Sequence, residues 1–372
     1  MNAKPRTLPR ERIAWPIAGG VLGTFLALLH LGTGLTFGAG FLAWCGTGAL
    51  VLVLSVHPIG ARVGALLAGL FLAVPSFVAD GPFARGALMC MGTGSLAVAA
   101  ALVLGQPFTG LRDRLAYLHT YGNTHPITPH ERGFDTAAFL RLVVATAFLA
   151  AGFAIVKVAA EYGLGLLVRW LGGEIAMLAV AELFTAGLPF AAAPLGINVP
   201  PMMQSPYRSA SVSEFWSRRW NLRMSEFLFR KGCFEPVARH GVAWGLFFAF
   251  ALSGVIHAVI AYVALWRWGI SLLCGAFFLV QPLLMAAERY LKVRRWQPWA
   301  RHAWTLAVLT LVSPMFIEPA LQCVEPYWGG LGLVPLQALA VLGGVLAISI
   351  MTALGSLTAR PVTARMAVEG AP

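Results

Sequence analysis

A histidine inside an apolar helix is the strongest chemical signal in this sequence. His257 is the one side chain between Val242 and Trp266 that titrates near neutral pH, and this run meets the roughly 20 apolar residues that a membrane span needs. Burial disfavours a charged imidazolium, so we expect the ring to stay neutral and able to accept a proton. The alternative is a structural role, in which the ring bonds a carbonyl or carboxylate on a neighbouring helix.

Small residues surround His257 on its own helical face. Ser253 and Gly254 precede it by four and three residues, and Ala261 follows it by four, which places all three beside the imidazole. They leave a notch into which a substrate or another helix could fit.

A basic and aromatic segment, residues 211–232, precedes this helix and is predicted to form an amphipathic interfacial helix. Ser211 and Glu214 have the spacing of a capping box, and Gly232 suits a left-handed stop. One face carries Val212, Trp216, Trp220, Met224, Phe227 and Leu228, and a separate stripe carries Arg219, Arg223, Glu226 and Arg230. Such a helix can simply anchor a protein at the membrane surface. Asn221, an uncharged amide in a run of Arg and Trp, favours a site instead.

Two motifs together resemble the wax synthase branch of the membrane-bound O-acyltransferases. The first is Ser-Glu-Phe-Trp-Ser-Arg-Arg-Trp-Asn at residues 213–221, and the second is Leu-Ser-Gly-Val-Ile-His at residues 252–257. The resemblance extends from about residue 201 to residue 318 and is weak in the first half of the chain. Family members often have Gly at the position of Ser217 and an acidic residue at that of Ala258, so what orients His257 is left open.

The resemblance implies transfer of an acyl group from acyl-CoA, as co-substrate, to a hydroxyl inside a membrane-embedded tunnel. His257 would match the catalytic histidine, removing the proton as the alcohol attacks, and Asn221 its polar partner, positioning the donor or stabilising the oxyanion. Direct transfer is expected, because nothing pairs Cys233 with a base that would make it an acyl carrier. No permanently bound cofactor or metal is expected. The substrate-binding candidates are Trp216, Arg218, Arg219, Trp220, Arg223, Ser253 and Gly254.

Three functions are compatible with these residues. The acceptor could be a lipophilic alcohol, as in wax-ester synthesis, or the hydroxyl of a terpenoid, sterol or secondary metabolite. A non-enzymatic lipid transporter or scaffold is the third possibility. Transporters usually show paired broken helices in two related halves, and the sequence contains no such pattern.

The composition places these residues in an all-α, polytopic membrane protein. Hydrophobic residues make up 58% of the 372 residues and charged residues 11%, with a mean hydropathy of +0.75. We predict about ten spans with interfacial helices and an internal tunnel, in a single domain with N-terminal spans (1–188), a cytoplasmic or interfacial segment (189–241) and C-terminal spans (242–372). The apolar runs fall near residues 14–34, 37–56, 62–79, 86–105, 137–159, 164–188, 242–266, 270–287, 303–323 and 333–355.

The net charge of +12 is concentrated in three loops, 106–136, 190–241 and 288–302, which an even span count places on one side. The positive-inside rule assigns that side, with both termini, to the cytoplasm. The expected partners of this charge are membrane lipids and acyl-CoA phosphates, and not nucleic acid. The first run, 14–34, is longer than the 7 to 15 residues of a signal peptide core and is predicted to be a retained span.

Several other polar residues have a structural interpretation. Glu174 and Glu182 could pair with His257 or a substrate hydroxyl, but a contact with Arg169 or another arginine is favoured. His119, His125 and His130 lack the tight clusters of a di-iron site. Five prolines between residues 189 and 206 prevent a continuous helix and predict an irregular segment around the entrance of the site.

Overall fold

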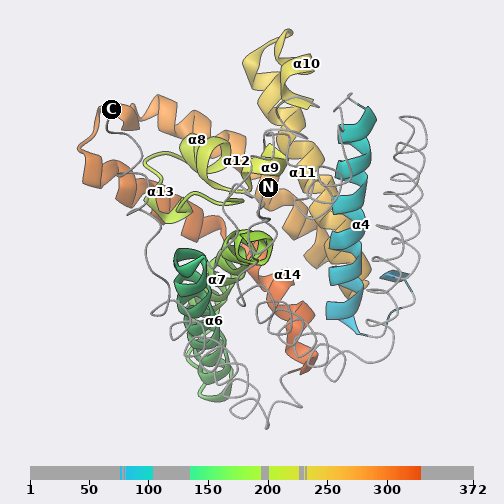
Figure 1. The fold of residues 1–372 in the computed structure, drawn as a ribbon. Coiled ribbons are helices and arrows are strands. Elements are labelled where there is room, and N and C mark those ends of the chain that lie inside the picture. The colour runs from blue at the N-terminus through green and yellow to red at the C-terminus, as the bar shows by residue number, and fades with distance from the viewer. Residues whose placement is uncertain are drawn as a thin grey trace, which may run out of the picture.

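The structure is a computed structural model that describes residues 76–77, 79, 81–103, 135–193, 201–225, 230 and 233–327. These residues form helices and turns without a strand, as the all-α prediction requires (Figure 1). The long helices are α4 (Pro82–Val103), α6 (Thr136–Glu161), α7 (Leu166–Ala192), α11 (Val242–Leu265), α12 (Trp268–Tyr290), α13 (Pro298–Val312) and α14 (Pro314–Val324). The short elements are η2 (Pro206–Arg208), α8 (Val212–Glu214), η3 (Phe215–Arg219), α9 (Leu222–Met224), α10 (Glu235–Ala238), η5 (Val293–Arg295) and η6 (Glu325–Tyr327).

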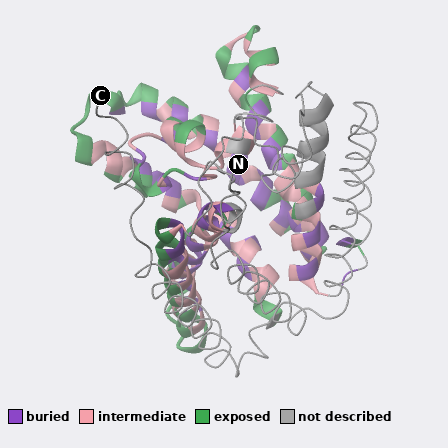
Figure 2. Cartoon of the chain, viewed as in Figure 1, coloured by how far each residue is buried: buried purple, intermediate pink, exposed green. Residues whose placement is uncertain are grey.

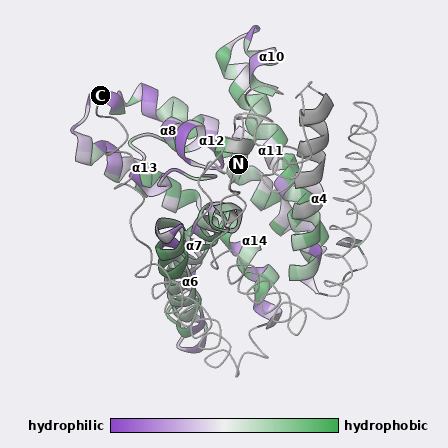
Figure 3. Ribbon diagram, viewed as in Figure 1, coloured by the Kyte–Doolittle hydropathy of each residue, from purple (hydrophilic) through white to green (hydrophobic). Residues whose placement is uncertain are grey.

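Among the helices that the structure describes, α6, α11 and α12 are long and apolar enough to cross a membrane. The pair α13 and α14 would make a fourth span, bent by 50° where Pro314 cannot donate a backbone hydrogen bond. Residues exposed to the surroundings run along α6 (Figure 2), and this helix is hydrophobic over most of its length (Figure 3), as expected for a surface in contact with lipid. The chain is therefore a membrane protein. The predicted spans at 14–34, 37–56 and 333–355 lie outside the described residues, so the count of ten stays a prediction.

Glycines allow the helices of each antiparallel pair to approach closely. A Cβ on Gly152 of α6 would lie 2.7 Å from the backbone of α7, and a Cβ on Gly254 of α11 would lie 2.8 Å from the carbonyl oxygen of Gly275 on α12. Helix pairs inside membranes commonly use small residues in this way, because packing and not hydrophobicity drives their association. Two tight hairpins, α6–α7 and α11–α12, therefore form the framework of the described part.

The end of α11 is fixed by an arginine from α4. The Arg85 guanidinium donates to the carbonyl oxygens of Val263 and Ala264 at 2.7 to 3.2 Å, two groups that have no partner in the last turn of a helix. Trp266 then adopts a left-handed conformation with φ 54°, which turns the chain into α12.

Two basic segments, residues 201–225 and 289–302, meet at the opposite end of the helices. The Val212 amide donates to Glu288 of α12 at 2.9 Å, and the His302 ring bonds the Ser209 carbonyl at 3.0 Å. Their contact agrees with the prediction that both lie on one side of the membrane. Assignment of that side to the cytoplasm stays a prediction, and both termini lie outside the described residues.

Candidate functional site

The helix predicted over residues 211–232 is broken at its centre, so that prediction was wrong. After α8 the chain widens into the π-helical turn η3, becomes extended at Trp220 and left-handed at Asn221 (φ 39°), and restarts as α9. Tertiary hydrogen bonds stabilise the break, since the Gln204 amide donates to the Arg219 carbonyl at 2.8 Å and the Leu222 amide to the Met202 carbonyl at 2.9 Å. The left-handed conformation is one that Asn tolerates better than most residues.

The predicted capping box is present in a modified form. The Ser211 hydroxyl accepts the Glu214 amide at 3.0 Å, but the Glu214 carboxylate turns back to the Ala210 amide at 2.9 Å instead of that of Ser211. Residues 226–232, apart from Arg230, lie outside the described part of the chain.

Trp216 packs this segment against helices α11 and α12. Its indole N–H donates to Gln281 of α12 at 2.9 Å, and its ring packs edge-on against Phe250 of α11 and Phe277 of α12. Gln281 is fully buried, and its amide group also donates to the Phe277 carbonyl. The apolar face of the segment is thus turned into the protein, and a purely lipid-anchoring role does not fit its described residues.

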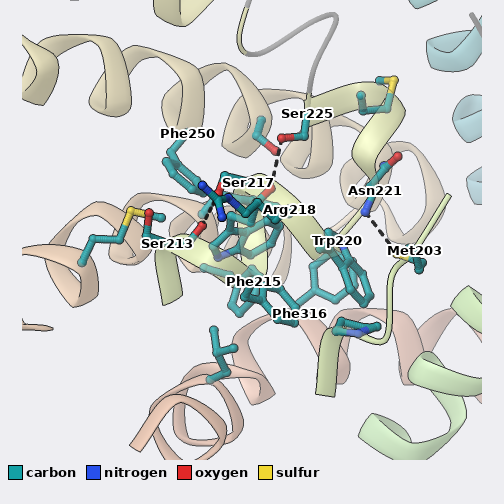
Figure 4. A pocket seen from close by; sticks show the side chains of 18 of the residues that line it. Met203, Ser213, Phe215, Ser217, Arg218, Trp220, Asn221, Ser225, Phe250 and Phe316 are labelled. Atoms are coloured by element: carbon teal, nitrogen blue, oxygen red, sulfur yellow. Dashed lines mark hydrogen bonds between the residues drawn. The ribbon is translucent and has the colours of Figure 1, made fainter. Parts of the chain in front are cut away.

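A cavity of about 930 Å³ lies between this segment and helices α7, α11, α12, α13 and α14. Its volume is within the range of small-molecule sites. Six of the nine predicted site residues line it: Trp216, Arg218, Trp220, Asn221, Ser253 and His257. Figure 4 shows Phe215 and Trp220, whose rings stack with centroids 5.3 Å apart. Met203, Gln204 and Pro206 complete this wall, where the proline-rich segment was expected. That this cavity is part of an internal tunnel through the protein stays a prediction.

His257 is oriented by its own helix. Its Nδ1 lies 2.8 Å from the Ser253 carbonyl oxygen, and because a carbonyl can only accept, Nδ1 must carry the proton. In a neutral ring the lone pair is then on Nε2. The imidazole stacks on Phe278 of α12 with ring centroids 4.1 Å apart, and Phe316 of α14 meets it at 5.7 Å. Because position 258 is an alanine, the sequence left open which group orients His257. In the structure, the backbone carbonyl of Ser253 and the ring of Phe278 do so.

Asn221 lines the same cavity from the irregular segment, where it precedes α9. Its backbone amide points to the Met203 sulfur at 3.1 Å (Figure 4). Its side-chain oxygen is buried and has no hydrogen-bond partner among the described residues. Buried polar atoms are normally satisfied in folded proteins, so this amide is suited to binding a ligand.

Three predicted substrate contacts are not brought into the described cavity wall. The Arg219 guanidinium pairs with the Glu214 carboxylate at 2.6 Å, and Gly254 contacts α12, so the notch beside His257 is filled there by a helix. The side chain of Arg223 lies outside the described atoms. Burial alone raises the pKa of Glu214, but the Ala210 amide and the Arg219 guanidinium outweigh it and hold the net pKa below the usual value.

Three charged residues that were not among the predicted site residues line the cavity: Glu174 of α7, Arg289 of α12, and Arg230. Glu182 pairs with Arg141 of α6, as the preference for an Arg–Glu contact predicted. For Glu174 that preference was wrong, because its carboxylate accepts a hydrogen bond from Thr310 at 3.0 Å and has no ion pair with a described residue. Arg169 pairs with Glu318 at 3.2 Å.

Burial raises the pKa of the Cys233 thiol, which reduces the thiolate needed for nucleophilic attack. Among the described residues, no group of three or more His, Cys, Asp or Glu could hold a metal ion.

The sequence around this cavity matches a known protein family. Residues 199–280 match the model of the membrane bound O-acyl transferase family. The resemblance drawn from the two motifs is confirmed. The matched segment contains the π-helical turn, Asn221, His257 and the first part of α12, and thus most of the cavity wall described above.

Curated plant proteins are similar over about a third of the chain. The probable long-chain-alcohol O-fatty-acyltransferase 1 of Arabidopsis thaliana is 31% identical over 132 residues, which are 32% of this chain and 37% of that protein. The long-chain-alcohol O-fatty-acyltransferase of Simmondsia chinensis is 32% identical over 132 residues, covering 33% and 35%. Number 7 of the Arabidopsis thaliana proteins is 30% identical over 145 residues, covering 34% and 41%. The matches thus span little more than a third of these relatives.

Proposed function

We propose that this protein is a membrane-bound O-acyltransferase that moves a fatty acyl group from acyl-CoA to the hydroxyl of a lipophilic alcohol. The observation that carries the proposal is that His257 and Asn221 line one cavity and both lie in the segment that matches the family. The similarity to long-chain-alcohol O-fatty-acyltransferases supports the choice of substrates.

His257 acts as the general base in the proposed reaction. With Nδ1 donating to the Ser253 carbonyl, Nε2 accepts the proton of the alcohol while the alcohol oxygen attacks the thioester carbonyl. The side-chain N–H of Asn221, on Nδ2, donates to the carbonyl oxygen as negative charge develops on it. The C–S bond then breaks, the imidazolium returns the proton to the coenzyme A thiolate, and the ester is released.

Cations at the cavity supply a site for coenzyme A. Arg218, Arg230 and Arg289 all line it, and arginine is suited to binding phosphate through paired N–H groups. Transfer is direct in this scheme, which the raised pKa of the Cys233 thiol supports.

The proposal is tested with membranes that contain the full chain, labelled acyl-CoA and a long-chain alcohol. Ester should form, and a correctly folded His257→Ala variant should lose activity by two to four orders of magnitude, the typical contribution of a general base. Full activity in that variant would overturn the role of His257. The absence of ester with every acceptor, in membranes that hold folded protein, would favour a lipid transporter or scaffold.

A further inference from the structure

The carboxyl group of Glu174 is the feature of the cavity that the proposed reaction does not use. Glu182 on the same helix and Glu318 on α14 are both paired with arginines. Glu174, in contrast, receives a hydrogen bond on Oε1 from Thr310, and Oε2 has no partner among the described residues. This oxygen belongs to a half-buried side chain that lines the cavity.

Glu174 lies at the same level of the helix bundle as His257. The ring centroids of His257 and Phe316 lie 5.7 Å apart. Ile317, the residue after Phe316, packs against Gly173 of α7, and a Cβ added to Gly173 would lie only 2.5 Å from the Ile317 methyl group. Gly173 is the neighbour of Glu174 in α7. The path from His257 to Glu174 therefore consists of the contacts His257–Phe316 and Ile317–Gly173 and of the two peptide bonds that join these pairs to each other and to Glu174.

Hydrogen bonds at one end of the bundle support the same alignment. The first turn of α7 is tied to α14 by Arg169 and Glu318, and Gln322 of α14 bonds both Glu318 and Arg267, which follows α11. Glu174 is eight residues from the start of α7 at Leu166 and His257 eight residues from the end of α11 at Leu265. At 1.5 Å per residue, each is about 12 Å from this end.

A simple alcohol cannot satisfy both groups. Its single hydroxyl proton must point to His257 Nε2 for the reaction, and the rest of the molecule is hydrocarbon. The surroundings of Glu174 in the cavity wall are apolar and include Met177, Leu178, Leu306 and Leu309. A hydrocarbon chain that displaced water from this region would leave Oε2 of the Glu174 carboxylate without a donor, which is costly for a charged group.

We propose that Glu174, held by Thr310, accepts a hydrogen bond from a second hydroxyl of the acceptor, so that the preferred acceptor is a lipophilic diol and not a plain long-chain alcohol. This inference rests on the proposed acyl transfer and specifies its acceptor class. The reacting hydroxyl lies at His257, and the second hydroxyl extends to the α7 side of the cavity.

The test compares acceptors of equal chain length in the full-length protein. A long-chain monoalcohol is compared with diols whose hydroxyls are separated by increasing numbers of carbons, and with the monomethyl ether of the best diol, which keeps the second oxygen but not its proton. Both ester formation and the rise in melting temperature on acceptor binding are measured, since the second needs no turnover. The proteins are the wild type, Glu174→Met, Thr310→Val and, as a matched control on the same helix, Glu182→Gln.

The wild type should prefer one diol spacing by roughly tenfold to a hundredfold over the monoalcohol, the usual effect of a hydrogen bond to a charged group. In Glu174→Met the ratio of diol to monoalcohol activity should fall to about one, and in Thr310→Val it should be smaller than in the wild type. Glu182→Gln should leave this ratio unchanged. The monomethyl ether should behave as a monoalcohol. A ratio near one at every spacing, or a preference that survives in Glu174→Met, would overturn the inference. If no acceptor gives ester while the diols still raise the melting temperature selectively, the acyl-transfer proposal fails and the Glu174 site stands.

Discussion

Replacing Gly254 by alanine should separate α11 from α12 and destabilise the protein. The added Cβ would lie 2.8 Å from the Gly275 carbonyl oxygen, 0.6 Å short of the 3.4 Å at which ordinary contact begins. The obstacle is backbone, which cannot rotate away, so the helices must move apart around His257 and Phe278. Overpacking of this kind costs about 1 to 3 kcal/mol.

Gly269→Ala is the matched control, because the same substitution on α12 meets no atom within 4 Å and should stabilise the helix by up to about 1 kcal/mol. The free energy of unfolding is measured for both variants by denaturing titration in mixed micelles, with tryptophan fluorescence as the signal. We expect shifts of opposite sign. If Gly254→Ala kept wild-type stability and only raised the KM for an acceptor, Gly254 would be a substrate contact and the helix-contact interpretation would be refuted.

Three further predictions concern the segment that carries the first motif. Gln281→Leu should lower the free energy of unfolding by about 1 to 3 kcal/mol, because the Trp216 indole N–H loses its partner in a buried setting; an unchanged denaturation midpoint would contradict this. Cys233→Ala should keep wild-type ester formation, whereas a loss of more than tenfold would indicate an acyl-enzyme at this thiol. Because the pKa of Glu214 is lowered in the fold, its stabilisation should be complete above roughly pH 4.3 and be lost as the pH falls through the lower folded-state pKa. Melting temperatures measured from pH 6 down to about pH 3 should therefore fall less steeply in Glu214→Gln than in the wild type, and parallel curves would show that Glu214 is not responsible.

The long helices and the main polar residues could be predicted from the sequence because they depend on local pattern. The apolar run around His257 begins and ends within a residue of α11, and six predicted site residues line one cavity. The break at Asn221 could not be predicted, since it depends on amides that bond residues 202 and 219 across a loop. Helical periodicity in residues 211–224 gave no sign of those bonds.

The residues that pair with the glutamates of α7 were predicted less well, and the reason is the geometry of the helix. Arg169 and Glu174 are close in sequence, but a spacing of five residues places them on different faces of α7. Arg169 pairs instead with α14, and Glu182 with an arginine of α6. Such pairings require knowledge of which helices are neighbours. An acidic residue in an apolar run is nevertheless a signal by itself, and in Glu174 it marked a residue of the cavity.

The bond from His257 to the Ser253 carbonyl has a consequence for how this site can change. Because the closer acceptor, at 2.8 Å, is main chain, no exchange of side chain at position 253 removes it, and Ser253→Ala would remove only the longer contact of the hydroxyl, 3.5 Å from Nδ1. The ring and its support also move together whenever α11 tilts or slides. A histidine tied to a carboxylate on another helix would lose its alignment in such a motion, whereas His257 keeps both its orientation on α11 and its tautomer.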